Sequence, residues 1–293
     1  LPILYQFSQT DSERIRIPAP LIFPHNKTLF LDNNGNVWRA NQWISRTCTL
    51  DKVDTIDQAE EVARTFALFT RSLSKGFATE KLKTTLPLFH DLRFRYLQFE
   101  EALEQASSER SASAGSLPNQ IKERIGYCRL FDQIKREPNH FPQRIMHHDA
   151  KISNILFEED KIKVWGPIDL DTVMPGYYFS DLGDMIRSLA GSIDENSKEI
   201  SNMDIRKDIY ERLVETYSGI MEDVWTEEEK KNKHACGLLL VYMQTLRFLA
   251  DHLNGDIYYQ VKYSGQNLER ALNQFQLLVC LENYLHEKHG YKI

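Results

Sequence analysis

The 293-residue sequence predicts an α+β fold, in which a mostly helical part follows a small β-rich part. Two observations predict it. Within the first 45 residues, apolar and aromatic segments stand on either side of an Asn/Gly turn, which is typical of a β-hairpin. Beyond that point apolar residues recur mainly at helical spacing, with one loop-rich interruption at residues 144–179. We therefore expect the remnant of a β-rich N-terminal lobe and hinge at residues 1–45, and a helical C-terminal lobe at residues 46–293.

The β-hairpin is predicted around residues 32–36, an Asp-Asn-Asn-Gly-Asn run that strongly favours a turn. Apolar residues at 29–31 precede the turn, and residues 37–44 resume as an alternating, aromatic-rich strand. Because a hairpin is too small to be stable alone, we expect it to belong to a sheet that is only partly present here.

Helices are predicted along most of the remaining chain. The first begins near Asp57, a capping residue with Glu60 three positions later, and ends at Gly76. The Ser-, Ala- and Gly-rich residues 107–116 are expected to form a flexible loop. Apolar periodicity predicts further helices at residues 90–106, 118–136, 203–221, 227–253 and 267–287.

Composition narrows the class of protein. Hydrophobic residues at 42% and charged residues at 27% are typical of a globular protein. The formal net charge of -6 argues against a nucleic-acid partner, because binding phosphate backbones needs clustered Lys and Arg. The four cysteines form no C-x-x-C pair, so neither zinc nor a disulfide framework is indicated. No signal peptide or apolar membrane span is visible, and we expect a cytoplasmic protein without a membrane partner.

The loop-rich interruption carries the residues with chemical potential. Asp149 and Asn154 have the Asp-x-x-x-x-Asn spacing of kinase catalytic loops, which presents a base and a metal-binding amide to one cleft. Lys151, two residues after the base, can reach a transferred phosphate. A short hairpin is predicted at residues 155–165, and Asp169 follows it as a second magnesium ligand. Together these residues predict a site for phosphoryl transfer.

Three segments, His147–Phe157, Ile168–Gly176 and Asp181–Arg187, resemble the aminoglycoside phosphotransferase/choline kinase superfamily. Within it the sequence is most similar to the N-acetylhexosamine 1-kinase branch, with further matches at Trp38–Arg39, Leu86–Asp91 and Arg247–Asp256. The resemblance implies a protein-kinase-like fold. It also implies ATP and magnesium as cofactors, and in-line transfer of the γ-phosphate to a hydroxyl of a small sugar.

The resemblance assigns roles residue by residue. Asp149 is the implied base, with Lys151 beside it, and Asn154 and Asp169 are the implied magnesium ligands. Four residues fall where the hexosamine-kinase branch contacts its sugar: Asp171, Thr172, Arg247 and Tyr258.

Three further residues are expected to support the catalytic loop. Asp181 and Asp184 would brace it by hydrogen bonds, and His147 would bond its backbone. His148 departs from the family, because relatives often carry Asn or Gly at this position. A larger departure is the lack of any G-x-G-x-x-G or G-x-x-x-x-G-K run and of an early strand lysine. On the family pattern, the first strands of the N-terminal lobe are expected to be absent from this sequence.

Several alternatives stay open. The acceptor could be another small alcohol, such as an aminoglycoside, choline or homoserine, or the chain could be a non-catalytic, degenerate kinase-like binding module. A metal-dependent hydrolase using His147 and His148 is disfavoured, because neighbouring histidines point in different directions. Asp171 and Thr172 could simply form a turn, Arg247 could pair with Asp251 one helical turn away, and Tyr258 could serve packing.

Overall fold

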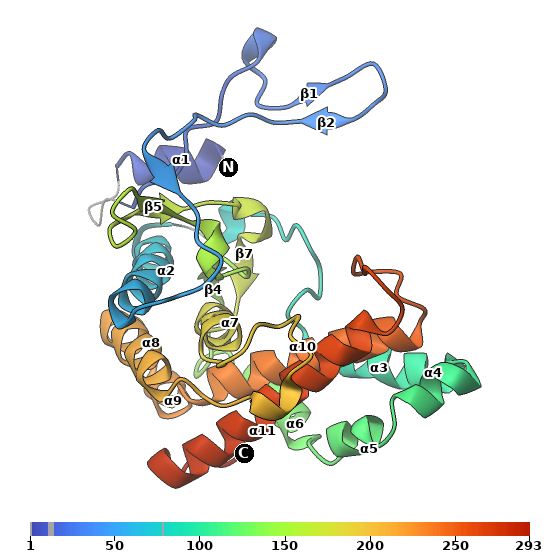
Figure 1. Cartoon of the computed structure of the whole chain (residues 1–293). Coiled ribbons are helices and arrows are strands. Elements are labelled where there is room, and N and C mark those ends of the chain that lie inside the picture. Colours follow the sequence, from blue (N-terminus) through green and yellow to red (C-terminus); the bar gives the residue numbers. More distant parts are fainter. Residues whose placement is uncertain (1, 11–14, 78) are drawn as a thin grey trace.

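A computed structural model describes residues 2–10, 15–77 and 79–293, and helices make up most of it (Figure 1). Residues 1, 11–14 and 78 lie outside this description, so part of the predicted N-terminal remnant does as well. The helices are α1 (Pro2–Ser8), α2 (Ile56–Gly76), α3 (Leu92–Gln105), α4 (Ser108–Ser113), α5 (Leu117–Lys122), α6 (Gly126–Arg136), α7 (Phe179–Leu189), α8 (Lys207–Ile220), α9 (Glu227–Lys231), α10 (Ala235–Leu253) and α11 (Gln266–His289).

The strands are short and form three small antiparallel sheets. They are β1 (Phe30–Leu31), β2 (Val37–Trp38), β3 (Thr47–Cys48), β4 (Arg144–Met146), β5 (Ile155–Glu158), β6 (Val164–Pro167) and β7 (Met174–Gly176). β1 pairs with β2, β5 lies between β3 and β6, and β4 pairs with β7.

The predicted N-terminal hairpin is present as β1 and β2, which extend away from the helices (Figure 1). The Asp32 carboxylate shapes the turn, because it accepts hydrogen bonds from the backbone N–H groups of Asn34 and Asn36 and from the indole N–H of Trp38. The second strand is shorter than the predicted residues 37–44. Beyond Trp38 the chain instead pairs with residues 19–21, through hydrogen bonds from Leu21 to Ala40 and from Gln42 to Ala19.

Several local predictions are wrong. Thr55, not Asp57, caps α2, since its side chain accepts from the backbone N–H of Gln58 and the Gln58 side chain accepts from that of Thr55. Residues 107–116 contain helix α4 instead of a flexible loop. Ser107 caps this helix, and Arg110 ties it to Asp256 at 2.8 Å and to the carbonyl of His252. The segments predicted as single helices at 118–136 and 227–253 each form two.

Helix α10 lies at the centre of the apolar core. It packs against α3, α6, α7 and α11, and most of its residues are buried. Gly183 in α7 allows this helix to approach α10 closely, because a Cβ atom at position 183 would lie 2.4 Å from the carbonyl oxygen of Cys236. None of the described helices combines the length and apolarity needed to cross a membrane.

Pairing between the strands brings two loops together. Residues 147–154 connect β4 to β5, and residues 168–173 connect β6 to β7. Because β4 pairs with β7 and β5 with β6, the two loops lie at the same end of these strand pairs. The backbone N–H of Ile168 donates to the carbonyl of Asn154 at 2.9 Å, which fixes one loop on the other.

Replacing Gly183 by alanine tests the close packing of α7 on α10. We expect Gly183→Ala to lower the free energy of unfolding by about 1–3 kcal/mol, because the added methyl group overpacks the contact. The measurement is urea unfolding followed by circular dichroism. Gly219→Ala, at an exposed position of α8 with open space around it, is the matched control and should raise stability by about 0.5–1 kcal/mol. Equal effects of the two substitutions would contradict this packing.

Candidate functional site

The first loop brings three predicted site residues into direct contact. The Asp149 carboxylate accepts a hydrogen bond from Lys151 Nζ at 2.8 Å and from Asn154 Nδ2 at 2.7 Å. Asn154 Nδ2 also donates to the carbonyl of Asp149 at 2.9 Å, and a 3-10 turn at Ile152–Asn154 lets the chain double back in this way. Asn154 is only 5% exposed, whereas Asp149 and Lys151 reach the surface of a cavity.

The start of this loop is held by Asp181, in the first turn of α7. The Asp181 side chain is fully buried and accepts hydrogen bonds from the backbone N–H of His147 at 3.0 Å and of His148 at 2.8 Å. Thr70 of α2 donates a third, at 3.2 Å. A buried carboxylate is stable only when hydrogen bonds replace its water, so the loop and the carboxylate stabilise each other.

His148 has a left-handed backbone, with a φ of 65°. Glycine and asparagine adopt this conformation more readily than histidine, which explains physically why Asn or Gly suits the position. The conformation turns the chain sharply between the buried His147 and the accessible Asp149.

His147 joins the two loops from inside the core. Its Nε2 lies 3.0 Å from the carbonyl oxygen of Ile168, and Thr172 donates to the carbonyl of His147 at 2.6 Å. Phe66 and Phe69 of α2 pack edge-on against its ring. The described residues contain no group of three His, Cys, Asp or Glu side chains able to hold a metal ion.

The second loop places two acidic residues near the N-terminal hairpin. Asp169 has a left-handed backbone with a φ of 57°, directly after the residue that bonds Asn154. Arg39, which follows β2, forms a two-point ion pair with Asp171, with Nη2 at 2.7 Å from Oδ2. The same Nη2 lies 4.0 Å from Asp169 Oδ1. Both carboxylates are about half exposed, and neither lines the cavity described next.

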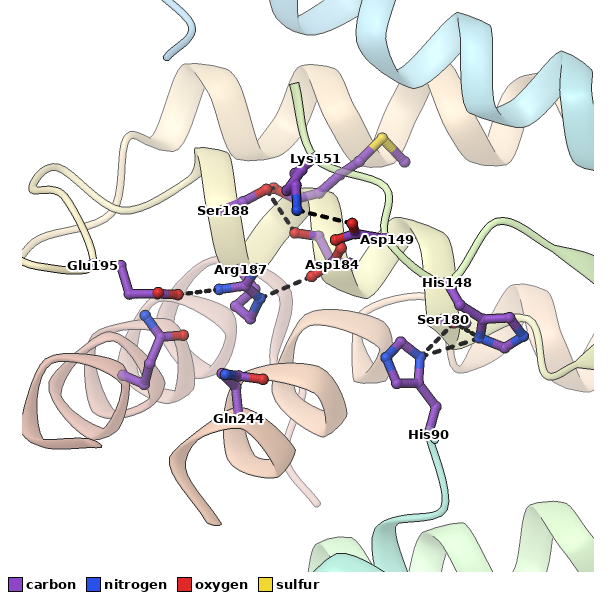
Figure 2. A network of polar contacts seen from close by, with 12 residues as sticks. His90, His148, Asp149, Lys151, Ser180, Asp184, Arg187, Ser188, Glu195 and Gln244 are labelled. Atoms are coloured by element: carbon purple, nitrogen blue, oxygen red, sulfur yellow. Dashed lines mark hydrogen bonds and ion pairs between the residues drawn. The ribbon is translucent and has the colours of Figure 1, made fainter. Parts of the chain in front are cut away.

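A cavity of about 480 Å³ opens beside Asp149. Figure 2 shows residues of its wall: Asp149 and Lys151 on one side, Asp184, Arg187 and Glu195 along another, and His90 with His148 opposite. Thr172, Arg247 and Tyr258 also line it, so three of the four predicted sugar contacts lie together and Asp171 lies apart.

Asp184 does not bond the catalytic loop, in contrast to our expectation. Its Oδ1 accepts from Arg187 Nε at 2.8 Å, and Arg187 also pairs with Glu195 at 2.5 Å. Burial raises the pKa of Asp184, while Arg187 acts in the opposite direction and the charge of Asp149 adds to the increase. Asp184 therefore forms part of the cavity wall and contributes to the electrostatic field inside the cavity.

Arg247 does not pair with Asp251, contrary to the alternative drawn from the sequence. It donates to Gln244 at 3.1 Å, and its guanidinium lies 5.0 Å from the ring centre of Phe89, 5.5 Å from that of Tyr259 and 6.0 Å from that of Tyr258. These are cation–π distances.

Asp251 instead shapes the loop after α10. Its carboxylate accepts from the backbone N–H groups of Ile257, Tyr258 and Tyr259 at 2.8–3.1 Å. These bonds hold both tyrosines beside the Arg247 guanidinium, although Tyr258 remains 67% exposed.

Several wall residues were not singled out from the sequence, among them Phe89, His90, Arg187, Glu195, Gln244, Tyr259 and Arg270. Two signals could have found some of them. Phe89 and His90 lie in the Leu86–Asp91 match, and Gln244 lies three residues before Arg247 on α10.

Comparison with known proteins identifies the class. The sequence profile of the phosphotransferase enzyme family (APH) matches residues 12–201, and the chain belongs to this family.

Solved structures share the fold. An aminoglycoside phosphotransferase from Alicyclobacillus acidocaldarius is similar, with 11% identity, a TM-score of 0.66 and coverage of 99% of this chain and 83% of that one. A choline kinase from Cryptosporidium parvum has 14% identity, a TM-score of 0.52 and coverage of 98% and 78%. A choline/ethanolamine kinase family protein from Mesorhizobium loti has 14% identity, a TM-score of 0.50 and coverage of 98% and 79%. The predicted α+β, kinase-like fold is confirmed; the hexosamine-kinase branch stays a prediction.

Replacing Asp181 by asparagine tests the support of the loop. The amide of Asp181→Asn keeps one acceptor oxygen and has an NH2 group in place of the other, so at least one of the two buried backbone N–H groups loses its partner. We expect the free energy of unfolding to fall by about 2–3 kcal/mol, measured by urea denaturation. Thr70→Val, which removes only the third hydrogen bond, is the control and should cost about 1 kcal/mol. An Asp181→Asn protein as stable as the wild type would show that the carboxylate does not hold the loop.

Proposed function

We propose that the protein is an ATP-dependent phosphotransferase that moves the γ-phosphate to a hydroxyl of a small sugar. The acceptor we propose is the anomeric hydroxyl of an N-acetylhexosamine. One observation carries the proposal: the carboxylate of Asp149 contacts both Lys151 and Asn154 and faces a cavity of about 480 Å³. Family membership supports the phosphotransferase chemistry, and the resemblance to the hexosamine-kinase branch supports the sugar.

In this proposal Asp149 binds the acceptor hydroxyl and accepts its proton. Its Oδ2 is engaged by Lys151 and Asn154, whereas Oδ1 accepts no hydrogen bond from any residue that the structure describes. One oxygen is therefore fixed and the other is available to the acceptor, as a positioned general base requires. Lys151, beside the base, would offset negative charge that develops on the transferred phosphoryl group.

Asn154 and Asp169 fit a magnesium ion. Because Asn154 Nδ2 donates to Asp149, its amide oxygen is left as the free atom, and no described residue donates to it. An amide oxygen and a carboxylate are the hard oxygen ligands that Mg²⁺ prefers, and this ion often takes few protein ligands and keeps several waters. When bound, magnesium would neutralise charge on the ATP phosphates. Arg39, whose Nη2 lies 4.0 Å from Asp169 Oδ1, is close enough to interact with the same phosphate charge.

The charges around the cavity favour a neutral acceptor over a cationic one. Among the described wall residues, each carboxylate is already paired: Asp149 with Lys151, and Asp184 and Glu195 with Arg187. Two further guanidinium groups on the wall, Arg247 and Arg270, have no carboxylate partner in the described part of the chain.

The aromatic group next to this cavity also disfavours an ammonium ion. Aromatic rings bind quaternary ammonium ligands by cation–π attraction. Here the rings of Phe89, Tyr258 and Tyr259 already surround the guanidinium of Arg247. An amine such as choline or an aminoglycoside would meet a like charge at this place, whereas the hydroxyl and amide oxygens of an N-acetylated sugar would accept hydrogen bonds from it.

The proposed base and metal ligand can be tested by isosteric substitutions. We expect Asp149→Asn and Asp169→Asn to lower kcat by at least about 100-fold, because loss of a general base alone costs roughly 100–10,000-fold. The assay measures ADP release with Mg-ATP and a panel of N-acetylhexosamines, hexoses, choline, homoserine and kanamycin. Asp57→Asn, an exposed aspartate in the first turn of α2, is the control and should leave kcat unchanged. Wild-type turnover in either site variant, with unchanged thermal stability, would refute the mechanism.

Substitution of Arg247 tests the choice of acceptor. Arg247→Met keeps the apolar stem against the aromatic rings and removes the charge. We expect the KM for N-acetylglucosamine to rise about 10–100-fold, since a hydrogen bond to a charged group contributes about 1.5–3 kcal/mol, while the KM for ATP stays the same. Arg64→Met, on the exposed face of α2, is the matched control. A wild-type preference for choline or kanamycin over every neutral sugar would contradict this assignment.

A further inference from the structure

Three polar side chains form a hydrogen-bonded group opposite Arg187 and have no role in the mechanism above. His90 and His148 line the cavity, and Ser180 is in contact with both. Ser180 Oγ lies 2.7 Å from His90 Nδ1 and 2.7 Å from His148 Nδ1, and the two Nδ1 atoms are 3.3 Å apart (Figure 2). Ser180, in the first turn of α7, is fully buried. A hydroxyl has one proton to donate, so at most one imidazole accepts from Ser180 and at least one donates to it.

The surroundings of His148 determine which group donates and which accepts in these two hydrogen bonds. The edge of its ring that carries Nε2 lies against β7, where a Cβ atom at Gly176 would be 2.5 Å from Nε2. Burial lowers the pKa of His148, while Asp181 and the backbone of Met174 and Pro175 act in the opposite direction. His148 Nε2 is buried and has no hydrogen-bond partner among the described residues. The backbone of Met174 and Pro175 raises the pKa of His148 through carbonyl oxygens, which attract an N–H group, so we assign the proton of neutral His148 to Nε2.

The positions of the remaining protons follow by elimination. A neutral His148 with a proton on Nε2 has a bare Nδ1, so Ser180 donates its hydroxyl proton to that atom. The oxygen of Ser180 then accepts from His90 Nδ1–H. A neutral His90 with its proton on Nδ1 leaves Nε2 bare.

His90 is held in the neutral form. Burial lowers its pKa well below the usual value, and the guanidinium groups of Arg247, Arg95 and Arg187 lower it further. Its Nε2 has no hydrogen-bond partner among the residues that the structure describes. Figure 2 shows this nitrogen turned away from Ser180 and His148, on the side of the ring that faces Gln244 and Arg187 across the cavity.

We propose that His90 is an acceptor-binding residue, whose bare Nε2 accepts a hydrogen bond from a hydroxyl of the bound sugar, and that Ser180 and His148 are positioning residues that fix its tautomer. The inference rests on the proposed function, because it requires the sugar to enter this cavity. Arg247 lies against Phe89, the neighbour of His90, so the wall offers a donor and an acceptor close together. A sugar hydroxyl can satisfy both, since it donates one hydrogen bond and accepts others, whereas a quaternary ammonium group can do neither.

The tautomer is tested first, without substrate. Long-range ¹H–¹⁵N correlation spectra of the wild-type protein, assigned with a His90→Asn variant, report which imidazole nitrogen carries the proton. We expect a bare Nε2 on His90 and a bare Nδ1 on His148, and we expect the Nε2 resonance of His90 to move when N-acetylglucosamine is added. A proton on His90 Nε2, or a resonance that saturating sugar leaves in place, overturns the inference.

Kinetics test the contact itself. An asparagine side chain can reach Ser180 as Nδ1 does but places no group at Nε2, whereas glutamine can reach the position of Nε2. We expect His90→Asn to raise the KM for N-acetylglucosamine about 3–10-fold, the value of one neutral hydrogen bond, with kcat and the KM for ATP unchanged. His90→Gln should recover part of this loss. His140→Asn, an exposed histidine outside the cavity, is the matched control.

The outcomes separate the two proposals. A wild-type KM in His90→Asn, with the sugar still phosphorylated by the wild-type protein, overturns the role of His90 alone. Absence of phosphate transfer from the wild-type protein to every sugar of the panel overturns the proposed function, and with it the role of His90. A raised KM with partial recovery in His90→Gln supports both.

Discussion

The buried carboxylate of Asp181 is the constraint on which the site depends. It accepts the backbone N–H groups of His147 and His148, and so fixes the chain at the residue where the backbone turns left-handed. That turn separates a histidine packed in the core from Asp149, which reaches the cavity. Removal of the carboxylate would leave buried donors unpaired, so the same hydrogen bonds that stabilise the fold also direct the proposed base. Stability and chemistry are coupled through one side chain at the start of α7.

The cavity has two chemically different sides. Asp149 lies on the side formed by the loop after β4, together with its lysine and amide partners. The opposite side presents the Arg247 guanidinium, surrounded by aromatic rings, and the imidazole of His90. We propose that phosphate transfer takes place on the first side and that the neutral acceptor binds to the second. Because α7 packs closely on α10, with Gly183 at the contact, the two sides are held at a fixed separation.

The sequence was sufficient to predict the fold class, the N-terminal hairpin and the grouping of Asp149, Lys151 and Asn154 in one loop, because these features depend on neighbouring residues. Features that depend on packing between distant segments were missed. His90 meets Ser180 only after α3 and α7 have each packed against α10, and helix α4 is held by contacts of Arg110 with the end of α10. The wrong cap of α2 has another cause. Two capping residues stand close together, each with a suitable partner three positions later, and propensity alone does not choose between them.

The most direct test of the central claim is diffraction from crystals grown with Mn²⁺ and a non-hydrolysable ATP analogue. Anomalous scattering locates the manganese ion independently of any assumption about the site. We expect one peak within ligand distance of Asn154 Oδ1 and the Asp169 carboxylate, and a terminal phosphate that points to the cavity beside Asp149. A metal ion bound elsewhere, or a terminal phosphate turned away from Asp149, would contradict the assignment of this loop as the site of phosphate transfer.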